Sequence, residues 1–179
     1  MQQIADLTNP YIQHEAGQIE LVPIGDRIYG MGAGLIMAAF AFPGGPSRFC
    51  DGLTGTYYAA SDLETAIAET RYHAELIMAG TEPCVTEKSV IHAGLGATLV
   101  DVRDGLPCPP DVYHPTDYTA GQEFGAMVRH LEGYGIVYNS VRRPEGDCAA
   151  IFRPPALSGA QVIRTLLYTW DGHHIANVR

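Results

Sequence analysis

Basic residues are scarce in this sequence. Of 179 residues, 11 are Lys or Arg and 20 are Asp or Glu, which gives a formal net charge of −9 at pH 7. A surface this negative repels phosphate backbones and anionic lipid, which argues against nucleic acid or a membrane surface as the main ligand. An anionic ligand would therefore have to be held by a few arginines gathered in a local pocket.

Paired cysteines, a leader and a long apolar run are also missing. The four cysteines, Cys50, Cys84, Cys108 and Cys148, form no C-x-x-C motif, and a chain of this length does not need disulfides, so we expect reduced thiols. The N-terminus has no basic segment followed by an apolar one. The longest apolar stretch, residues 30–42, falls short of the roughly 20 residues that span a bilayer. These absences predict a cytoplasmic protein with no membrane attachment.

Several common catalytic motifs do not occur. There is no G-x-x-x-x-G-K-[S/T] phosphate loop, and the glycine-rich run at residues 30–34 lacks the third glycine of the dinucleotide fingerprint. No G-x-S-x-G nucleophile motif is present. The histidines do not have the spacing of metal ligands, so no metal site is expected.

What the sequence does contain is enough apolar material for a folded core. Hydrophobic residues make up 46% and charged residues 17%, a balance that excludes a disordered chain. The length fits one domain, and no internal repeat stands out. We therefore expect a single domain over residues 1–179, with an irregular lead-in at residues 1–24.

Short elements separated by turns predict the fold class. We expect strands at residues 26–31, 55–60, 85–92, 97–102, 135–141 and 148–152, a helix from residue 116 or 117 to about 131, a helix or strand at 33–42, and a C-terminal hairpin at 161–178 around Asp171-Gly172. The strands do not alternate strictly with helices. An α+β fold with a mostly antiparallel sheet and flanking helices is therefore favoured over a doubly wound parallel sheet.

The clearest helix follows residues 55–60. Ser61-Asp62-Leu63-Glu64 has the form of a capping box, with Ser61 as the cap, and Gly80 ends the helix. Glu69 lies at the border of the apolar face, where its carboxylate could point into a cleft. The alternative is a solvated glutamate that contacts His73 one turn later, and the pattern alone favours this second interpretation.

Four other polar residues stand among apolar or small neighbours. Arg27 stands two residues before Tyr29, and Arg48 directly precedes Phe49. A guanidinium in that setting either forms a structural ion pair or binds an anion such as a phosphate. Tyr58 is either a core residue or a stacking platform for a planar ring. Ser140 could simply terminate a strand. Taken singly, each residue is weak evidence of function, and the structural interpretation is favoured for both arginines and for Tyr58.

Three separated blocks of the sequence, taken in order, point further. The first is G-T-Y-Y-A-A-S-D-L-E-T-A-I-A-E at residues 55–69, which matches G-T-x-Y-x-A-s-x-x-E-T-A-x-x-E without a gap. Arg48-Phe49 upstream matches an R-F/W element, with Arg27 as an earlier arginine. Downstream, residues 135–152 contain Y-x-S-x-R, then Gly, then A-x-F. Over about residues 27–152 the chain thus resembles the RES-domain family, named for its Arg, Glu and Ser positions.

This resemblance implies a fold similar to ADP-ribosyltransferases and diphtheria-type toxins. It also implies the toxin of a bacterial toxin–antitoxin pair, with an Xre-type helix-turn-helix antitoxin as partner and a toxin homodimer within the larger assembly. The expected substrate is NAD⁺, cleaved at the nicotinamide–ribose bond by hydrolysis or phosphorolysis. Alternatives are transfer of ADP-ribose to a protein target, or a non-catalytic module that binds NAD⁺ or ADP-ribose. A protein that binds no nucleotide is ranked last.

The resemblance also implies roles for five residues. Arg27 and Arg48 would bind the diphosphate, Tyr58 would stack on the nicotinamide, and Ser140 would hydrogen-bond the nicotinamide ribose or amide. Glu69 would stabilise the cation that develops on the ribose. Glu69, Arg48 and Ser140 are therefore the expected catalytic residues.

Overall fold

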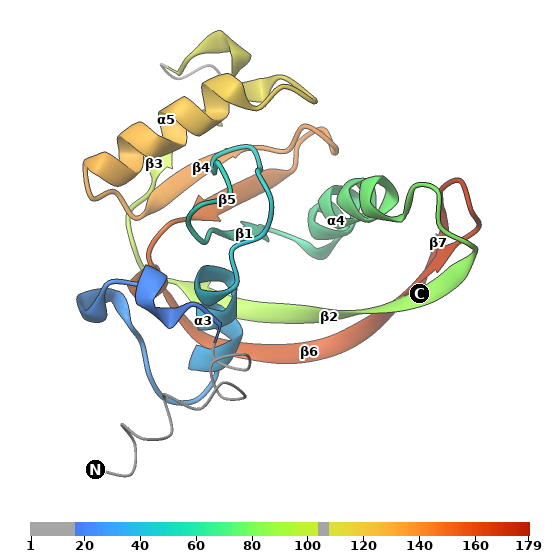
Figure 1. Cartoon of the computed structure of the whole chain (residues 1–179), viewed down its shortest axis with the longest axis horizontal. Coiled ribbons are helices and arrows are strands. Elements are labelled where there is room, and N and C mark those ends of the chain that lie inside the picture. Colours follow the sequence, from blue (N-terminus) through green and yellow to red (C-terminus); the bar gives the residue numbers. More distant parts are fainter. Residues whose placement is uncertain (1–16, 104–107) are drawn as a thin grey trace.

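The computed structural model describes residues 17–103 and 108–179, so most of the lead-in lies outside the described residues (Figure 1). The helices are α3 (Ala33–Ala41), α4 (Leu63–Met78) and α5 (Thr119–His130). The strands are β1 (Tyr57–Ala60), β2 (Cys84–Leu95), β3 (Val100–Asp101), β4 (Gly135–Asn139), β5 (Asp147–Ile151), β6 (Leu157–Trp170) and β7 (Ile175–Val178). The described helices are not long and apolar enough to cross a membrane.

The strands form two sheets. One has the order β1-β5-β4-β3 and the other the order β2-β6-β7. All neighbouring strands are antiparallel except β3 and β4, which are parallel. The prediction of an α+β fold with mostly antiparallel sheet is confirmed.

The four-stranded sheet is covered on both faces. On one face, Phe124 and Val128 of α5 pack with Ile136 and Tyr138 of β4. On the other face, α3 packs against alternate residues of β5, including Ile151. Both faces of β5 are thereby buried, which explains why residues 148–152 read as a continuous apolar run.

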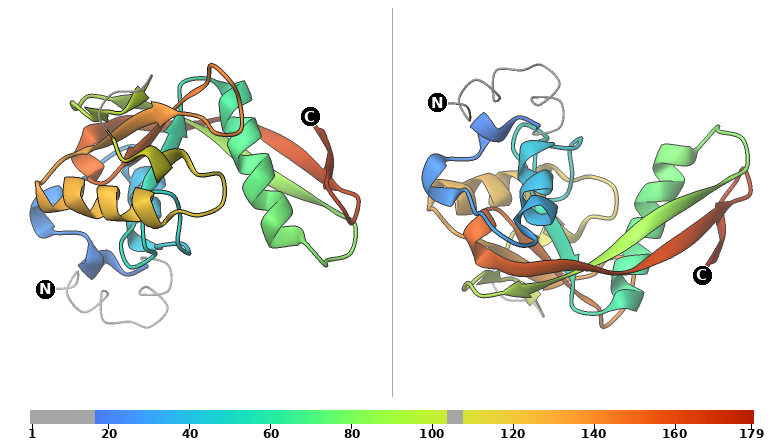
Figure 2. Two further views of the ribbon diagram at one scale, coloured as in Figure 1. Left: turned by 90° about the horizontal axis from the view of Figure 1, so that it is seen from above. Right: turned by 90° about the horizontal axis from the view of Figure 1, so that it is seen from below.

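The three-stranded sheet carries α4. Ala74 of α4 packs on Leu166 and Tyr168 of β6, together with Ile175 of β7. In Figure 2, the paired β2 and β6 run from beneath the four-stranded sheet to the far end of α4. The start of β6 (Leu157) belongs to the core around α3, while its later residues belong to the core under α4. This long pair of strands thus holds the two halves of the molecule together.

Some predicted element bounds were wrong. The strand expected at residues 26–31 is absent; a short 3-10 turn, Ile24–Asp26, is followed by extended chain, and Gly30 and Gly32 have positive φ angles that interrupt a strand. The strand expected at 97–102 is reduced to Val100–Asp101. The C-terminal hairpin is present, but its loop spans four residues because Trp170 pairs with Ile175. The Asp171 carboxylate accepts hydrogen bonds from the backbone N–H groups of His173 and His174 in that loop.

The helix α4 begins one residue later than the capping-box interpretation requires. The cap is Asp62, whose carboxylate accepts hydrogen bonds from Thr65 N and Thr65 Oγ1 at 2.9 and 2.8 Å. Ser61 only donates to Asp62, and Glu64 forms an ion pair with Arg143 at 2.6 Å instead of reaching back to the cap. The shift follows from chemistry, because the Asp62 carboxylate satisfies two donors at once.

Candidate active site

A cleft of about 640 Å³ opens between the two halves of the molecule, a size typical of small-molecule sites. Its walls come from the loop before β1, from β1 itself, from one side of α4 and from β2. Three of the five predicted site residues line it: Arg48, Tyr58 and Glu69. Tyr138 and Cys148, from neighbouring strands β4 and β5, complete the wall near Glu69.

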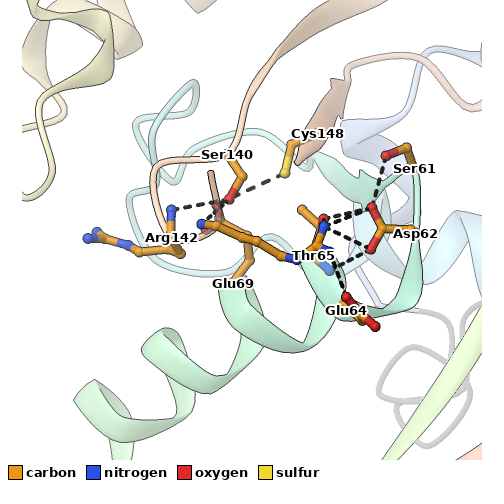
Figure 3. Close-up of polar contacts among 9 residues, drawn as sticks. Ser61, Asp62, Glu64, Thr65, Glu69, Ser140, Arg142 and Cys148 are labelled. Carbon is orange, nitrogen blue, oxygen red and sulfur yellow. Dashed lines mark hydrogen bonds and ion pairs between the residues drawn. The ribbon is translucent and has the colours of Figure 1, made fainter. Parts of the chain in front are cut away.

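Glu69 is held by Ser140. The Ser140 hydroxyl lies 2.6 Å from Glu69 Oε1, although the two residues are 71 positions apart (Figure 3). Ser140 Oγ also accepts hydrogen bonds from the backbone N–H groups of Arg142 and Arg143, at 3.1 and 3.0 Å. A hydroxyl has one hydrogen and two lone pairs, so both lone pairs are used and the hydrogen goes to Glu69. In this arrangement Ser140 orients the carboxylate and has no hydrogen left for a ligand.

Cys148 lies on the other side of the same carboxylate. Its Sγ is 4.0 Å from Glu69 Oε1 (Figure 3). Burial, and then the nearby Glu69 charge, raise the pKa of the Cys148 thiol to about 12. The thiol is therefore neutral at physiological pH and is not a nucleophile there. The Cys148 side chain therefore forms a weakly polar part of the cleft wall beside Glu69.

Arg48 is one of the few buried charged residues and is fixed by the backbone. Its Nη1 donates to the carbonyl oxygens of Val112 and His114, at 2.7 and 2.9 Å. Its guanidinium carbon lies 5.0 Å from the centre of the Tyr118 ring, which also lines the cleft. Within the described residues, Nε and Nη2 have no hydrogen-bond partner, so Arg48 can still offer donors to an anion.

Two glycines of α5 place Arg48. A Cβ built on Gly121 would come within 2.2 Å of the Arg48 carbonyl oxygen, and one on Gly125 within 2.4 Å of the Phe49 carbonyl oxygen. Only glycine permits this close packing of the loop on the helix. The position of Arg48 thus depends on residues more than 70 positions away in the sequence.

Tyr58 is fixed at its hydroxyl. That oxygen accepts a hydrogen bond from Phe49 N at 3.0 Å and shares another with Ser47 Oγ at 2.9 Å. Burial raises the pKa of the phenol, so it stays protonated at neutral pH. The side chain is nevertheless 39% exposed in the cleft, so the ring is both oriented and accessible.

Arg27 is not brought to the cleft. Its Nε donates to the carbonyl oxygen of Val22 at 3.0 Å, and the residue does not line the cavity. The neighbouring aromatic, Tyr29, is 83% exposed. The structure therefore assembles four of the five predicted residues, three in the wall and Ser140 through Glu69, and leaves Arg27 outside.

Several cleft residues were missed from the sequence. Tyr138 is buried, and its ring packs edge-on against Phe49 with centroids 4.9 Å apart. Burial raises the pKa of its phenol well above the usual value. Tyr138 of β4 stands two residues before Ser140, which directly follows the strand, so the Y-x-S block could have indicated that the two side chains share a face. Lys88 and Tyr118 carried no such local signal.

His73 lies one turn after Glu69 on α4 and also lines the cleft. Desolvation lowers its pKa, and the charges of Arg142 and Arg48 add to that effect, while Glu69 opposes it. Arg142 stacks over the Tyr72 ring at 3.4 Å. His73 is thus neutral at pH 7.

Among the described residues, no group of three His, Cys, Asp or Glu side chains is arranged to hold a metal ion.

Comparison with protein-family models finds a match over most of the chain. A family model described as the RES domain covers residues 26–171, well over half of the chain. The match extends past residue 152, where the sequence blocks end, and so includes all of β6. It supports an NAD-related, toxin-like function at the level of the family. No curated protein matches the sequence.

Proposed function

The chain belongs to the RES-domain family, and on that premise we propose that it is a toxin that cleaves NAD⁺ at the nicotinamide–ribose bond. The observation that carries the proposal is the Glu69 carboxylate, fixed by Ser140 at 2.6 Å in the cleft that Arg48 and Tyr58 also line. Depletion of NAD⁺ would arrest growth of the bacterial cell.

The charges of the cleft suit this substrate. The described lining residues with permanent charge are Arg48, Lys88 and Glu69, so the cleft carries more positive than negative charge in a chain of net charge −9. NAD⁺ joins an anionic diphosphate to a cationic nicotinamide ring. Arg48 would bind the diphosphate, and the oriented Tyr58 ring would stack on the nicotinamide.

Glu69 would act on the bond that breaks. When the C1′–N bond breaks, its electron pair goes to the nicotinamide nitrogen and a positive charge develops on the ribose ring. A carboxylate held beside C1′ stabilises that charge, and the Ser140 hydrogen bond fixes it in place before the reaction. With water as the acceptor, the products are ADP-ribose, nicotinamide and one proton. With phosphate as the acceptor, the phosphate oxygen forms the new bond to C1′.

Nicotinamide release tests the activity. Purified protein is incubated with NAD⁺, and nicotinamide is quantified by chromatography. We expect Glu69→Gln to lower kcat by a factor of 10² to 10³, the loss typical of a group that stabilises transition-state charge. Glu123→Gln is the matched control, since Glu123 is exposed on α5 and does not line the cleft. Equal release by wild type and Glu69→Gln would overturn the proposal.

The fate of a label on the adenylate half identifies the acceptor. We propose hydrolysis or phosphorolysis first, which would give ADP-ribose or its phosphate ester in buffers without and with phosphate. A labelled protein band after addition of cell lysate would instead identify a mono-ADP-ribosyltransferase. Bound but intact NAD⁺ would identify a non-catalytic binding module.

The biological setting is proposed with the activity. The toxin would act in the cytoplasm, as a homodimer within a complex with an Xre-type helix-turn-helix antitoxin that blocks the cleft. Induced expression in bacteria should lower cellular NAD⁺ and stop growth, and Glu69→Gln should relieve both effects. Growth arrest by the Glu69→Gln variant at equal expression would contradict NAD⁺ cleavage as the cause.

A further inference from the structure

Hydrolysis of NAD⁺ releases a proton that the mechanism above does not assign to any residue. As the oxygen of the attacking water bonds to C1′, one O–H bond must break, and its hydrogen needs an acceptor within reach of that water. Glu69 already stabilises the ribose cation, and its Oε1 accepts the Ser140 hydroxyl at 2.6 Å (Figure 3). A second base beside Glu69 would divide the two tasks between two side chains.

Few side chains in the described cleft wall can accept a proton at pH 7. Arg48 and Lys88 are cations and have no free lone pair. Phenols and thiols ordinarily keep their hydrogen at this pH, and burial raises the pKa values of Tyr58, Tyr138 and Cys148 further. These five residues therefore cannot serve as the base.

Cys50 and His73 are the other candidates in that wall. Burial raises the pKa of the Cys50 thiol and hydrogen bonds to its sulfur lower it by more, but its hydrogen is donated to the Thr54 carbonyl oxygen at 2.8 Å. A neutral imidazole, by contrast, carries one nitrogen with a free lone pair. His73 is thus better suited than Cys50 to take a proton from water.

His73 stands one helical turn after Glu69 on α4, and both side chains line the cleft. Residues four apart share a helix face, with Cβ atoms about 5–6 Å apart, so one water molecule can contact the carboxylate and the imidazole together. The His73 ring lies edge-on to the Tyr72 ring, with centroids 5.3 Å apart. Within the described residues its nitrogens have no hydrogen-bond partner, so they are available to that water.

The charges around His73 keep this lone pair available. Burial lowers the pKa of the imidazole, Glu69 raises it, and the guanidinium groups of Arg142 and Arg48 lower it again, with a net lowering. Lys88 of β2 is a further cation in the same wall. Once the imidazole has taken a proton, the neighbouring carboxylate of Glu69 stabilises the new positive charge.

We propose that His73 is the general base that activates the water attacking C1′, an assignment that rests on the proposed function. The water oxygen bonds to C1′, the electron pair of the C1′–N bond leaves with nicotinamide, and the water proton passes to His73 and then to solvent. Azide or phosphate needs no such base, because its attacking atom already bears negative charge. His73 therefore acts when water is the acceptor.

Azide separates this role from a structural one. We expect His73→Gln to lower kcat for NAD⁺ hydrolysis about 10²-fold at pH 7, the loss typical of a missing general base. Sodium azide should restore nicotinamide release by this variant, with ADP-ribosyl azide detected by mass spectrometry. His130→Gln is the matched control, since His130 is exposed on α5 and does not line the cleft. It should hydrolyse NAD⁺ at the wild-type rate.

The pH profile gives a second readout. In wild type, kcat for hydrolysis should fall as the pH decreases below 6.5, because protonated imidazole cannot accept a proton. Over the same interval, azide-dependent release by His73→Gln should stay level. Profiles of equal shape for hydrolysis by wild type and by His73→Gln would overturn the assignment.

The two proposals fail in different ways. If His73→Gln hydrolyses NAD⁺ as fast as wild type, or if azide does not restore its nicotinamide release, the base is wrong and NAD⁺ cleavage stands. Loss of hydrolysis in Cys50→Ser but not in His73→Gln, or release by wild type with phosphate but not with water, leads to the same conclusion. Absence of release by wild type with water, phosphate and azide would overturn the cleavage itself, and the base with it.

Discussion

Single residues in this protein take their roles from partners that lie far away in the sequence. Arg27 and Arg48 have the same local pattern, a guanidinium beside an aromatic residue, yet only Arg48 reaches the cleft. Arg48 is placed by contacts with the backbone of Val112 and by the close approach of Gly121. Local sequence could nominate both arginines, but it could not choose between them, because the deciding contacts span more than 60 positions.

Ser140 should act as a positioning residue. Its hydrogen goes to Glu69, so Ser140→Ala leaves the carboxylate free to rotate, and we expect kcat to fall roughly 10- to 30-fold with little change in KM. Ser140→Thr retains the hydroxyl and should recover most of the rate. Steady-state kinetics of nicotinamide release separates the two parameters. A raised KM with normal kcat in Ser140→Ala would show instead that Ser140 contacts the substrate.

Cys148 should be the unreactive thiol of the cleft. Its pKa of about 12 keeps it protonated at pH 8, whereas the exposed Cys84 has no such protection from burial. Peptide mass spectrometry after iodoacetamide treatment at pH 8 should therefore show Cys84 alkylated many times faster than Cys148 in the folded protein. Similar rates for the two thiols would contradict this arrangement.

The raised pKa of Cys148 also has a consequence for stability. The folded protein holds the thiol proton up to about pH 12, while the unfolded chain releases it near the ordinary value of 9. Between these pH values the folded state binds more protons, so this group's contribution to the free energy of unfolding is complete below pH 9 and decreases as the pH rises. Cys148→Ala should remove that decrease in urea titrations performed across this range.

At the scale of elements, the sequence predicts a helix or strand well where the residues of that element alone determine its position. The helix expected after residue 61 is α4, and its apolar spacing corresponds to the packing of Ala74 on β6. The error at its cap was one residue, because Ser61 and Asp62 can both cap and only the carboxylate satisfies two donors of Thr65. Short strands such as β3 were predicted poorly, since their length depends on the partner strand.

The contact between α5 and the Arg48 loop predicts the effect of one methyl group. In Gly121→Ala the new Cβ would lie 2.2 Å from the Arg48 carbonyl oxygen, so the loop must move. We expect a loss of about 1–3 kcal/mol in the free energy of unfolding, together with a raised KM for NAD⁺. Gly34→Ala in α3 is the control, because nothing lies within 4 Å of its Cβ, and it should stabilise by about 0.4–1 kcal/mol. Urea denaturation measures both values, and an equal effect of the two substitutions would contradict the close packing.

At the scale of the whole molecule, the cleft exists because two separately packed halves share one pair of strands. Neither periodicity nor motif spacing indicated that β6 begins at Leu157 in one core and ends at Trp170 in another. The sequence predicted only its second part, from residue 161, as one arm of a hairpin. The residues before it were unassigned because their apolar contacts are with α3 and not with a neighbouring turn.

A ligand that contacts both halves should stabilise the whole chain. Arg48 belongs to the half built on the four-stranded sheet and Glu69 to the half that carries α4, so ADP-ribose bound in the cleft would bridge them. At a concentration 100 times the dissociation constant, binding adds about 2.7 kcal/mol. For a domain of this size that corresponds to a rise in melting temperature of roughly 5–10 °C in differential scanning calorimetry.

Two arginine variants make that measurement specific for the cleft. Arg48→Lys keeps the charge and loses the forked donor geometry, so the ligand-induced rise in melting temperature should fall by more than half. Arg27→Met should retain the full rise, because Arg27 donates to the Val22 carbonyl oxygen and lies outside the cleft wall. If ADP-ribose no longer raised the melting temperature of Arg27→Met but still raised that of Arg48→Lys fully, the phosphates would bind outside this cleft, near Arg27. Absence of any rise in wild type at millimolar ADP-ribose would contradict dinucleotide binding altogether, because a bound ligand must stabilise the folded state that holds it.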